Sequence, residues 1–215
     1  MAIGRERIID EALLLLNEVG IDKLSTRKLA ERLGVQQPAL YWHFRNKSQL
    51  LDAINSEMLL RYHDDRVPKP GEDWVSFTLS NARSVRKALL SVRDGARLTA
   101  GTRPSVTDFA DTEKVLQLYV DAGFSTKEAF GIAICVTRYV VGYVLEEQGE
   151  QERERIDQNG AKVDFDAELA PLPLLTEALE TFRQVGTVNT EDVFESGLGY
   201  LVLGLQDALR RKRSI

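Results

Sequence analysis

Residues 26–44, TRKLAERLGVQQPALYWHF, contain the strongest structural signal in this chain of 215 residues. Ser25 or Thr26 can cap a short helix, and Gly34 supplies the positive φ that a tight turn after that helix requires. Pro38 can begin the next helix, because the first helical residue has no hydrogen-bonding use for an N–H. Two short helices joined by such a turn are typical of a helix-turn-helix unit.

The apolar positions of this stretch predict which of its faces is buried. Leu29, Leu33 and Leu40 can pack against a preceding helix over residues 8–19, whose apolar residues have helical spacing. The outer face then keeps a mixed set of polar, small and aromatic side chains: Arg27, Gln37, Ala39, Tyr41, Trp42 and His43. Since the second helix of such a motif enters the major groove of DNA, we expect this face to contact duplex DNA.

Donor and acceptor chemistry divides the expected contacts into two kinds. The guanidinium of Arg27 matches guanine, the amide of Gln37 matches adenine, and the methyl group of Ala39 fits thymine. Other side chains are better suited to phosphate oxygens, which fix register without reading sequence. The full predicted surface comprises Thr26, Arg27, Gln37, Pro38, Ala39, Tyr41, Trp42, His43 and Lys47. Two alternatives stay open: the two large aromatic residues pack inside the domain, and Arg27 is merely a solvated charge.

The distribution of charge supports a nucleic-acid partner for the N-terminal segment only. The whole chain has a net charge of −5. Residues 1–47 nevertheless hold eight Lys and Arg against six Asp and Glu, a net charge of +2, whereas the remainder has a net charge of −7. This contrast between segments is a better guide to partners than the total charge.

The rest of the sequence predicts an all-α fold. A connecting helix over 48–63 is followed by helical patterns over 72–99, 106–122, 126–148, 173–184 and 191–211, with Ser125 and Glu128 forming a capping box. The polar segment 149–171 predicts a mobile surface loop. We therefore expect a helix-turn-helix domain (1–47), a connecting helix (48–63) and a larger helical domain for ligand binding and dimerisation (64–215).

Composition excludes several classes of protein. No stretch approaches the roughly 20 consecutive apolar residues of a membrane-spanning helix. The single cysteine, Cys135, cannot form an internal disulfide and is expected to be a buried small residue, so a cytoplasmic location is predicted. The only histidines are His43 and His63, and no catalytic constellation, phosphate loop or metal-spaced pair is present, which indicates that the chain is not an enzyme.

Ile8 to Leu51, including the motif quoted first, resembles the DNA-binding domain of the tetracycline-repressor family, and most closely that of the tetracycline repressors themselves. The similarity continues beyond this domain over residues 5–148, with a short further match at 173–175. It includes Arg93-Asp94-Gly95-Ala96, Gly101-Thr102-Arg103-Pro104, Gly123-Phe124-Ser125 and Val144-Leu145-Glu146.

The resemblance implies a homodimeric repressor that binds a palindromic operator and is released by a small-molecule inducer. In those repressors a drug–magnesium complex enters the C-terminal core, and the segment like 101–104 rearranges. The helix like 48–63 transmits this change, so that the DNA-binding domains move apart. For this chain the implied inducer is tetracycline–magnesium or another polycyclic or aromatic compound. No cofactor is expected, apart from magnesium together with a tetracycline-type ligand.

Carried over by position, the resemblance implies a ligand site. His63 and Asn81 match residues that hydrogen-bond the drug, while Thr102 and Arg103 match the rearranging turn. Four further positions depart from the pattern: Thr99 replaces a magnesium-ligating histidine, Val85 a phenylalanine, Val115 a glutamine and Arg138 a second histidine. Glu146 matches a carboxylate that holds the magnesium water shell from the partner subunit. Because a threonine hydroxyl is a poor substitute for imidazole, both the inducer and the use of magnesium stay open.

Interpretations without a functional role also stay open for the candidate residues outside the helix-turn-helix unit. Residues 101–105 also fit a surface turn, His63 an exposed helix end, Glu146 a solvated acidic face, and the basic tail 210–213 a solvated terminus rather than a nucleic-acid contact. The apolar helices 126–148 and 191–206 are the expected dimer interface. Rival functions are an enzyme with an all-α pocket and a DNA-binding protein without an inducer, and activation stands beside repression.

Overall fold

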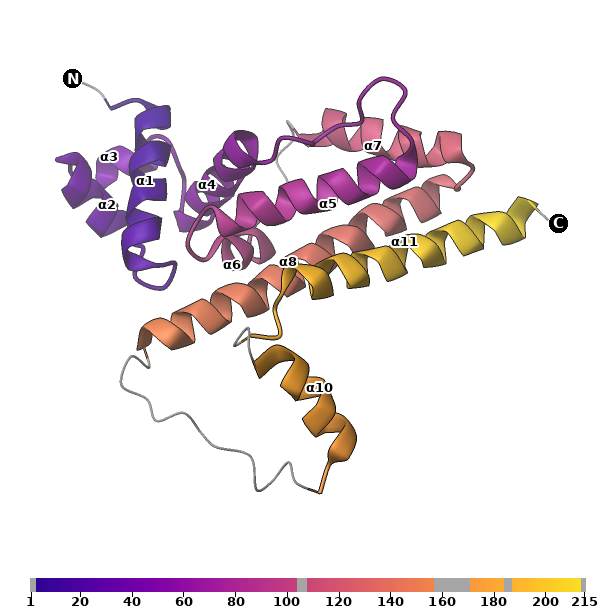
Figure 1. Cartoon of the computed structure of the whole chain (residues 1–215). Coiled ribbons are helices and arrows are strands. Elements are labelled where there is room, and N and C mark those ends of the chain that lie inside the picture. Colours follow the sequence, from indigo (N-terminus) through magenta and orange to yellow (C-terminus); the bar gives the residue numbers. More distant parts are fainter. Residues whose placement is uncertain (1–2, 104–107, 157–170, 184–186, 214–215) are drawn as a thin grey trace.

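The computed structural model describes residues 3–103, 108–156, 171–183 and 187–213, and within these ranges the chain forms helices and no strand (Figure 1). The helices are α1 (Arg5–Val19), α2 (Thr26–Leu33), α3 (Pro38–Tyr41), α4 (Lys47–Tyr62), α5 (Trp74–Leu90), α6 (Gly95–Ala100), α7 (Phe109–Ala122), α8 (Thr126–Ile156), α10 (Pro173–Arg183) and α11 (Glu191–Arg213). The predicted all-α fold class is confirmed.

The N-terminal helices form a small unit at one end of the molecule, and α4 leads from it into the larger body (Figure 1). The local signals act as expected: the Ser25 hydroxyl accepts a hydrogen bond from Lys28 N at 3.2 Å, and Gly34 has φ 68°. Pro38 is the first residue of α3. Leu29 and Leu40 are buried, so α2 and α3 are held against the rest of this unit through their apolar faces.

The larger body is organised around α5 and α8, which pack against each other along much of their length (Figure 1). α7 and α6 pack on α8, and α11 lies beside it. Tyr139 and Tyr143 of α8 donate hydrogen bonds to the carbonyl oxygens of Phe194 and Thr190 at 2.7 Å each. These bonds fix the start of α11 on α8. The capping box is also present, with Ser125 N donating to Glu128 Oε2 at 2.8 Å and Glu128 N donating to Ser125 Oγ at 3.4 Å.

The prediction of a single helix over 72–99 is wrong, because the helix is interrupted between the end of α5 and the start of α6. Asp94 adopts φ 58°, and its carboxylate accepts a hydrogen bond from Ile21 N at 2.8 Å. Gln148 of α8 bridges the break, donating to the carbonyl oxygens of Leu89 and Val92. Since these partners lie far away in sequence, helical periodicity alone could not reveal the interruption.

Two further expectations need correction. α8 continues to Ile156, so the first part of the predicted loop 149–171 is helical, and Glu150 accepts hydrogen bonds from Thr187 and Asn189. Residues 157–170 of that predicted loop lie outside the described residues. Cys135, expected to be buried, is exposed, because it lies on a side of α8 that the described chain leaves uncovered.

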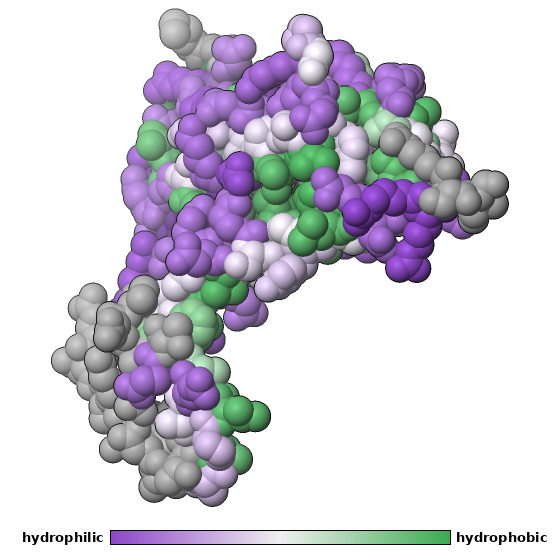
Figure 2. Space-filling view, turned by 45° about the vertical axis from the view of Figure 1, so that its right-hand side comes forward, coloured by the Kyte–Doolittle hydropathy of each residue, from purple (hydrophilic) through white to green (hydrophobic). Residues whose placement is uncertain are grey.

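Apolar side chains remain uncovered at several places on the surface. Figure 2 shows such side chains gathered on one face of the main body and on the lobe that contains α10. Leu174 of α10 is 81 % exposed, and Tyr200 and Leu203 of α11 are also exposed. Exposed apolar groups of this size are typical of surfaces that another molecule covers.

By length and composition, one helix of the described chain could cross a membrane: α8, over residues Thr126–Arg153. In the structure this helix packs against α5, α7 and α11, and its Val140 and Val144 are completely buried. We therefore interpret α8 as a core helix of the larger domain.

Candidate DNA-binding surface and ligand cavity

The outer face of α2 and α3 presents the predicted DNA-binding residues to solvent. Trp42 is 89 % exposed and Tyr41 is 47 % exposed, so neither ring packs inside the N-terminal domain. Gln37 Nε2 donates to Thr26 Oγ1 at 2.8 Å and to the Tyr41 hydroxyl at 3.3 Å. These hydrogen bonds hold the Gln37 amide in position on the surface. Less side-chain entropy is therefore lost when the amide hydrogen-bonds a DNA base.

The remaining predicted DNA contacts surround this group. Arg27 is exposed and its Nε lies 2.9 Å from Glu31 Oε1, and Lys47 is exposed at the start of α4. Pro38 is exposed, whereas Ala39 is half-buried. Apart from Lys47, which begins α4, these positions lie on or next to α2 and α3, as the helix-turn-helix pattern predicts.

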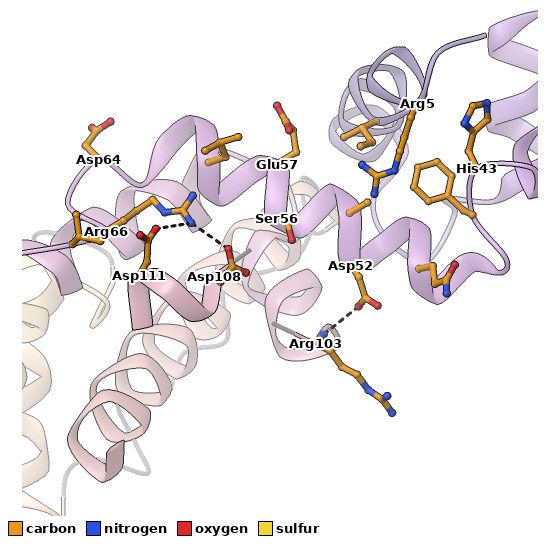
Figure 3. Close-up of a pocket in the computed structure, with 16 residues that line it drawn as sticks. Arg5, His43, Asp52, Ser56, Glu57, Asp64, Arg66, Arg103, Asp108 and Asp111 are labelled. Carbon is orange, nitrogen blue, oxygen red and sulfur yellow. Dashed lines mark hydrogen bonds and ion pairs between the residues drawn. The ribbon is translucent and has the colours of Figure 1, made fainter. Parts of the chain in front are cut away.

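His43 lies differently, at the edge of a groove of about 970 Å³ between the N-terminal unit, α4 and the start of α7. Figure 3 shows its ring near Arg5, with acidic residues of α4 further along the groove. Arg66 reaches across the far end, with its Nη2 3.2 Å from Asp108 Oδ1 and 3.3 Å from Asp111 Oδ2. The groove is thus lined by charges of both signs.

A second, more apolar cavity of about 390 Å³ lies among α4, α5, α6, α7 and α8. This volume is within the range of small-molecule sites. Most of the predicted ligand residues line it: His63, Asn81, Val85, Thr99, Thr102, Arg103 and Val115. Arg138 does not line it and is exposed on α8. Glu146 is exposed on α8 as well, and its contact from the partner subunit stays a prediction. Pro104, the end of the predicted rearranging turn, lies outside the described residues.

The cavity also contains residues that sequence reasoning missed. Phe77 and Tyr119 add aromatic walls, and Asn55, Arg66 and Thr112 add polar groups. For Asn55 a signal existed, because it is a polar residue on the buried face of α4, where it is only 6 % exposed. A buried polar side chain in an apolar stripe indicates a specific partner. No comparable signal marks the other residues.

One end of the cavity is organised by a neutral histidine. His63 Nδ1 lies 2.8 Å from Ser84 Oγ, and Nε2 lies 3.4 Å from Asn81 Nδ2. Since the Asn81 nitrogen can only donate, His63 Nε2 accepts and Nδ1 carries the proton. Burial, assisted by the charge of Arg66, lowers the pKa of His63 to about 4. His63 is therefore an uncharged ring facing the cavity and not a solvated helix-end cation.

The other end of the cavity is hydrogen-bonded directly to α4. Thr99 Oγ1 donates to Asn55 Oδ1 at 2.7 Å, and Arg103 N donates to Asp52 Oδ1 at 3.1 Å. The Thr102 hydroxyl donates to Thr99 O at 3.1 Å and closes the end of α6. These bonds connect this end of α6 to α4, which begins at Lys47, a few residues after α3.

Two protein-family models together match most of the chain. Residues 8–54 match "Bacterial regulatory proteins, tetR family", and residues 67–209 match "Tetracyclin repressor-like, C-terminal domain". The chain belongs to the TetR family. It is similar to the tetracycline repressor protein class A from transposon 1721 of Escherichia coli, with 48 % identity over 92 % of this chain and 88 % of the relative.

Solved structures of TetR-family proteins share this architecture. A variant of TetR from Acinetobacter baumannii AYE in complex with minocycline is 40 % identical, with a TM-score of 0.75 over 96 % of this chain and 98 % of that one. TetR (class A) in complex with 5a,6-anhydrotetracycline and magnesium is 40 % identical, with a TM-score of 0.71 over 95 % and 99 % of the two chains. The chain is thus a transcriptional repressor of the TetR family, whose α2–α3 unit is the DNA-binding helix-turn-helix.

The side chains that line this cavity do not form a magnesium site by themselves. Within the described residues no group of three or more His, Cys, Asp or Glu side chains could hold a metal. Thr99 donates its hydroxyl proton to Asn55, and the two cavity carboxylates, Asp108 and Asp111, lie against Arg66. Magnesium prefers free carboxylates and water in octahedral geometry.

Proposed function

We propose that this repressor is a homodimer that binds a palindromic operator and leaves it when a polycyclic or aromatic molecule occupies the α4–α8 cavity. The observation that carries the proposal is the pair of hydrogen bonds from the cavity to α4, Thr99 to Asn55 and Arg103 to Asp52. An inducer that prefers a different position of α6 also changes the position of α4 and the spacing of the two DNA-binding units. The change in operator affinity is limited by this difference in ligand affinity between the two states.

Dimerisation is part of the proposal, because one short recognition helix reads too few base pairs for specific binding. The exposed apolar residues of α8 and α11 supply a surface for a second copy. As a DNA-binding repressor, the protein is proposed to act in the cytoplasm and to convert no substrate. Magnesium is not required in this scheme.

The test combines operator selection with release. Selection from random duplexes with the full-length protein should recover a palindrome, and 5a,6-anhydrotetracycline or minocycline should then release the selected duplex in a gel-shift titration. Val115→Trp, which fills the cavity, should bind the same duplex but lose the release. Val188→Trp, at an exposed position, should behave as wild type. Recovery of no preferred palindrome would contradict the proposal.

A further inference from the structure

The α6 end of the cavity is occupied by a neutral hydrogen-bonding pair. Thr99 Oγ1 lies 2.7 Å from Asn55 Oδ1, and both side chains line the cavity. Asn55 is only 6 % exposed, so its oxygen depends on the Thr99 proton. A hydroxyl that donates to a buried amide retains oxygen lone pairs but no negative charge, which makes it a weak ligand for a hard divalent cation.

The charged groups of the cavity also disfavour a cation. Arg66 spans Asp108 and Asp111, and Figure 3 shows its guanidinium directed at these two carboxylates. A divalent ion would have to displace this arginine to reach either carboxylate. Arg103 adds a second positive charge to the lining, and no ion pair to its side chain is present in the described part of the chain. The electrostatic environment therefore suits an uncharged ligand better than a metal complex.

The opposite end offers groups that bind an organic ligand directly. Asn81 Nδ2 donates to Asp65 O at 2.8 Å, which fixes the amide, and no described residue donates to its Oδ1. The adjacent His63 ring is neutral. Between the two polar ends lie Val85, Val115 and Phe77. An apolar centre with a hydrogen-bonding group at each end matches a flat aromatic molecule with hydroxyl or carbonyl groups at both ends.

We infer that this repressor takes an aromatic polycyclic inducer through direct hydrogen bonds at the Thr99–Asn55 and His63–Asn81 ends, without a divalent metal ion. The inference rests on the proposed function and specifies its ligand. A ligand oxygen that accepts the Thr99 proton breaks the bond to Asn55. Because Asn55 belongs to α4, ligand contact at this point acts on the connecting helix with no metal between them.

The experiment measures binding of 5a,6-anhydrotetracycline to the full-length protein by calorimetry, in a buffer with magnesium chloride and in one with EDTA. For wild type the dissociation constants in the two buffers should agree within about threefold, which corresponds to well under the 1.4 kcal/mol of a tenfold change. A requirement for magnesium in the wild-type protein would overturn the inference. Absence of binding in both buffers would overturn it as well, since the cavity would then not take this class of molecule.

Three substitutions at one position separate the roles of hydroxyl and metal. Thr99→Val should weaken binding by about three- to tenfold in both buffers, because it removes the hydroxyl and leaves nearly the same volume. Thr99→Ser, which keeps the hydroxyl, should bind the ligand about as tightly as wild type. Thr99→His supplies an imidazole and should make binding about tenfold tighter with magnesium than with EDTA. Wild-type binding in Thr99→Val would contradict the proposed contact.

Operator binding distinguishes a failure of this inference from a failure of the proposed function. A protein that selects a palindrome and is released only when magnesium is present keeps the proposed function and loses the inference. A protein that binds the probe equally in both buffers but selects no palindrome supports the inference about the ligand and contradicts the proposed function.

Discussion

At the DNA-binding surface, Arg27 and Gln37 are held by neighbours that DNA can replace. The Arg27–Glu31 pair is exposed, and an exposed ion pair of this kind contributes little stability. We therefore expect Arg27→Ala and Gln37→Ala to lower the preference at one base pair of each half-site by about 1–3 kcal/mol. Competition gel shifts with duplexes altered at single positions measure this directly.

Lys47 provides the matched comparison. If it contacts phosphate, Lys47→Ala should weaken binding to all sequences equally and reduce the slope of log affinity against log salt by about one. A changed base preference in Lys47→Ala would show that the division into base and phosphate contacts is wrong.

The buried imidazole of His63 makes stability depend on pH. Its pKa is about 4 in the folded protein, against an ordinary value of 6.5, so the unfolded chain binds more protons between these values. The free energy of unfolding should therefore be greatest above pH 6.5 and fall as the pH is lowered towards 4, by up to about 1.4 kcal/mol per pH unit from this group. Urea unfolding at fixed protein concentration measures the slope.

His63→Gln should flatten this dependence between the two pKa values. His43→Gln, at the only other histidine, is the matched control for the loss of an imidazole. Equal slopes in wild type and His63→Gln would mean that the ring binds its proton as readily in the folded protein as in the unfolded chain.

On the scale of elements, the residues that connect α5 to α6 link the N-terminal domain to the larger body through hydrogen bonds. Asp94 accepts from Ile21 N, and Arg93 N donates to Asn17 Oδ1 at 2.8 Å. Arg97 adds an ion pair to Asp22 at 2.8 Å. A Cβ atom at Gly95 would collide with the carbonyl oxygen of Leu89, so only glycine permits this close approach.

Substitutions of Asp94 separate its two contributions. Asp94→Gly removes the carboxylate but tolerates φ 58°, and it should lower the free energy of unfolding by about 1 kcal/mol. Asp94→Ala should cost about 1 kcal/mol more, because alanine is strained in the left-handed region. Asp94→Asn, which keeps an acceptor oxygen and tolerates this conformation, should cost least. Urea unfolding gives the order, and equal values for Gly and Ala would exclude a conformational contribution.

On the scale of the whole molecule, α11 presents exposed apolar residues along one face, among them Tyr200 and Leu203. If a second copy covers this face, Leu203→Glu places a charge in an apolar interface and should convert the dimer to a monomer, which light scattering after gel filtration detects. Leu14→Glu, at a half-exposed position on α1, is the control and should remain dimeric. A dimeric Leu203→Glu protein would place the interface elsewhere.

The structure also changes the interpretation of the C-terminal basic residues. Arg211 lies 2.8 Å from Asp207, and Lys212 is paired with Glu128 of α8. The residues of the predicted tail that the structure describes are thus part of the last turns of α11. These ion pairs favour the interpretation of a solvated helix end over a nucleic-acid contact.

What sequence by itself determined is the helix-turn-helix unit. Its cap at Ser25 and its turn at Gly34 follow from hydrogen bonds and steric limits among residues a few positions apart, whereas the exposure of Trp42 was settled by the structure. Local interactions of this kind are encoded where they act, and periodicity then assigns the buried face.

Only the tertiary structure decided the cavity and the break before α6. The cavity joins side chains from five helices, and the partners Thr99 and Asn55 are 44 residues apart. The break depends on a hydrogen bond between residues 73 positions apart, Ile21 and Asp94. Such contacts exist only after the helices have packed, so no local pattern could predict which side chains would meet or that Arg138 would not line the cavity.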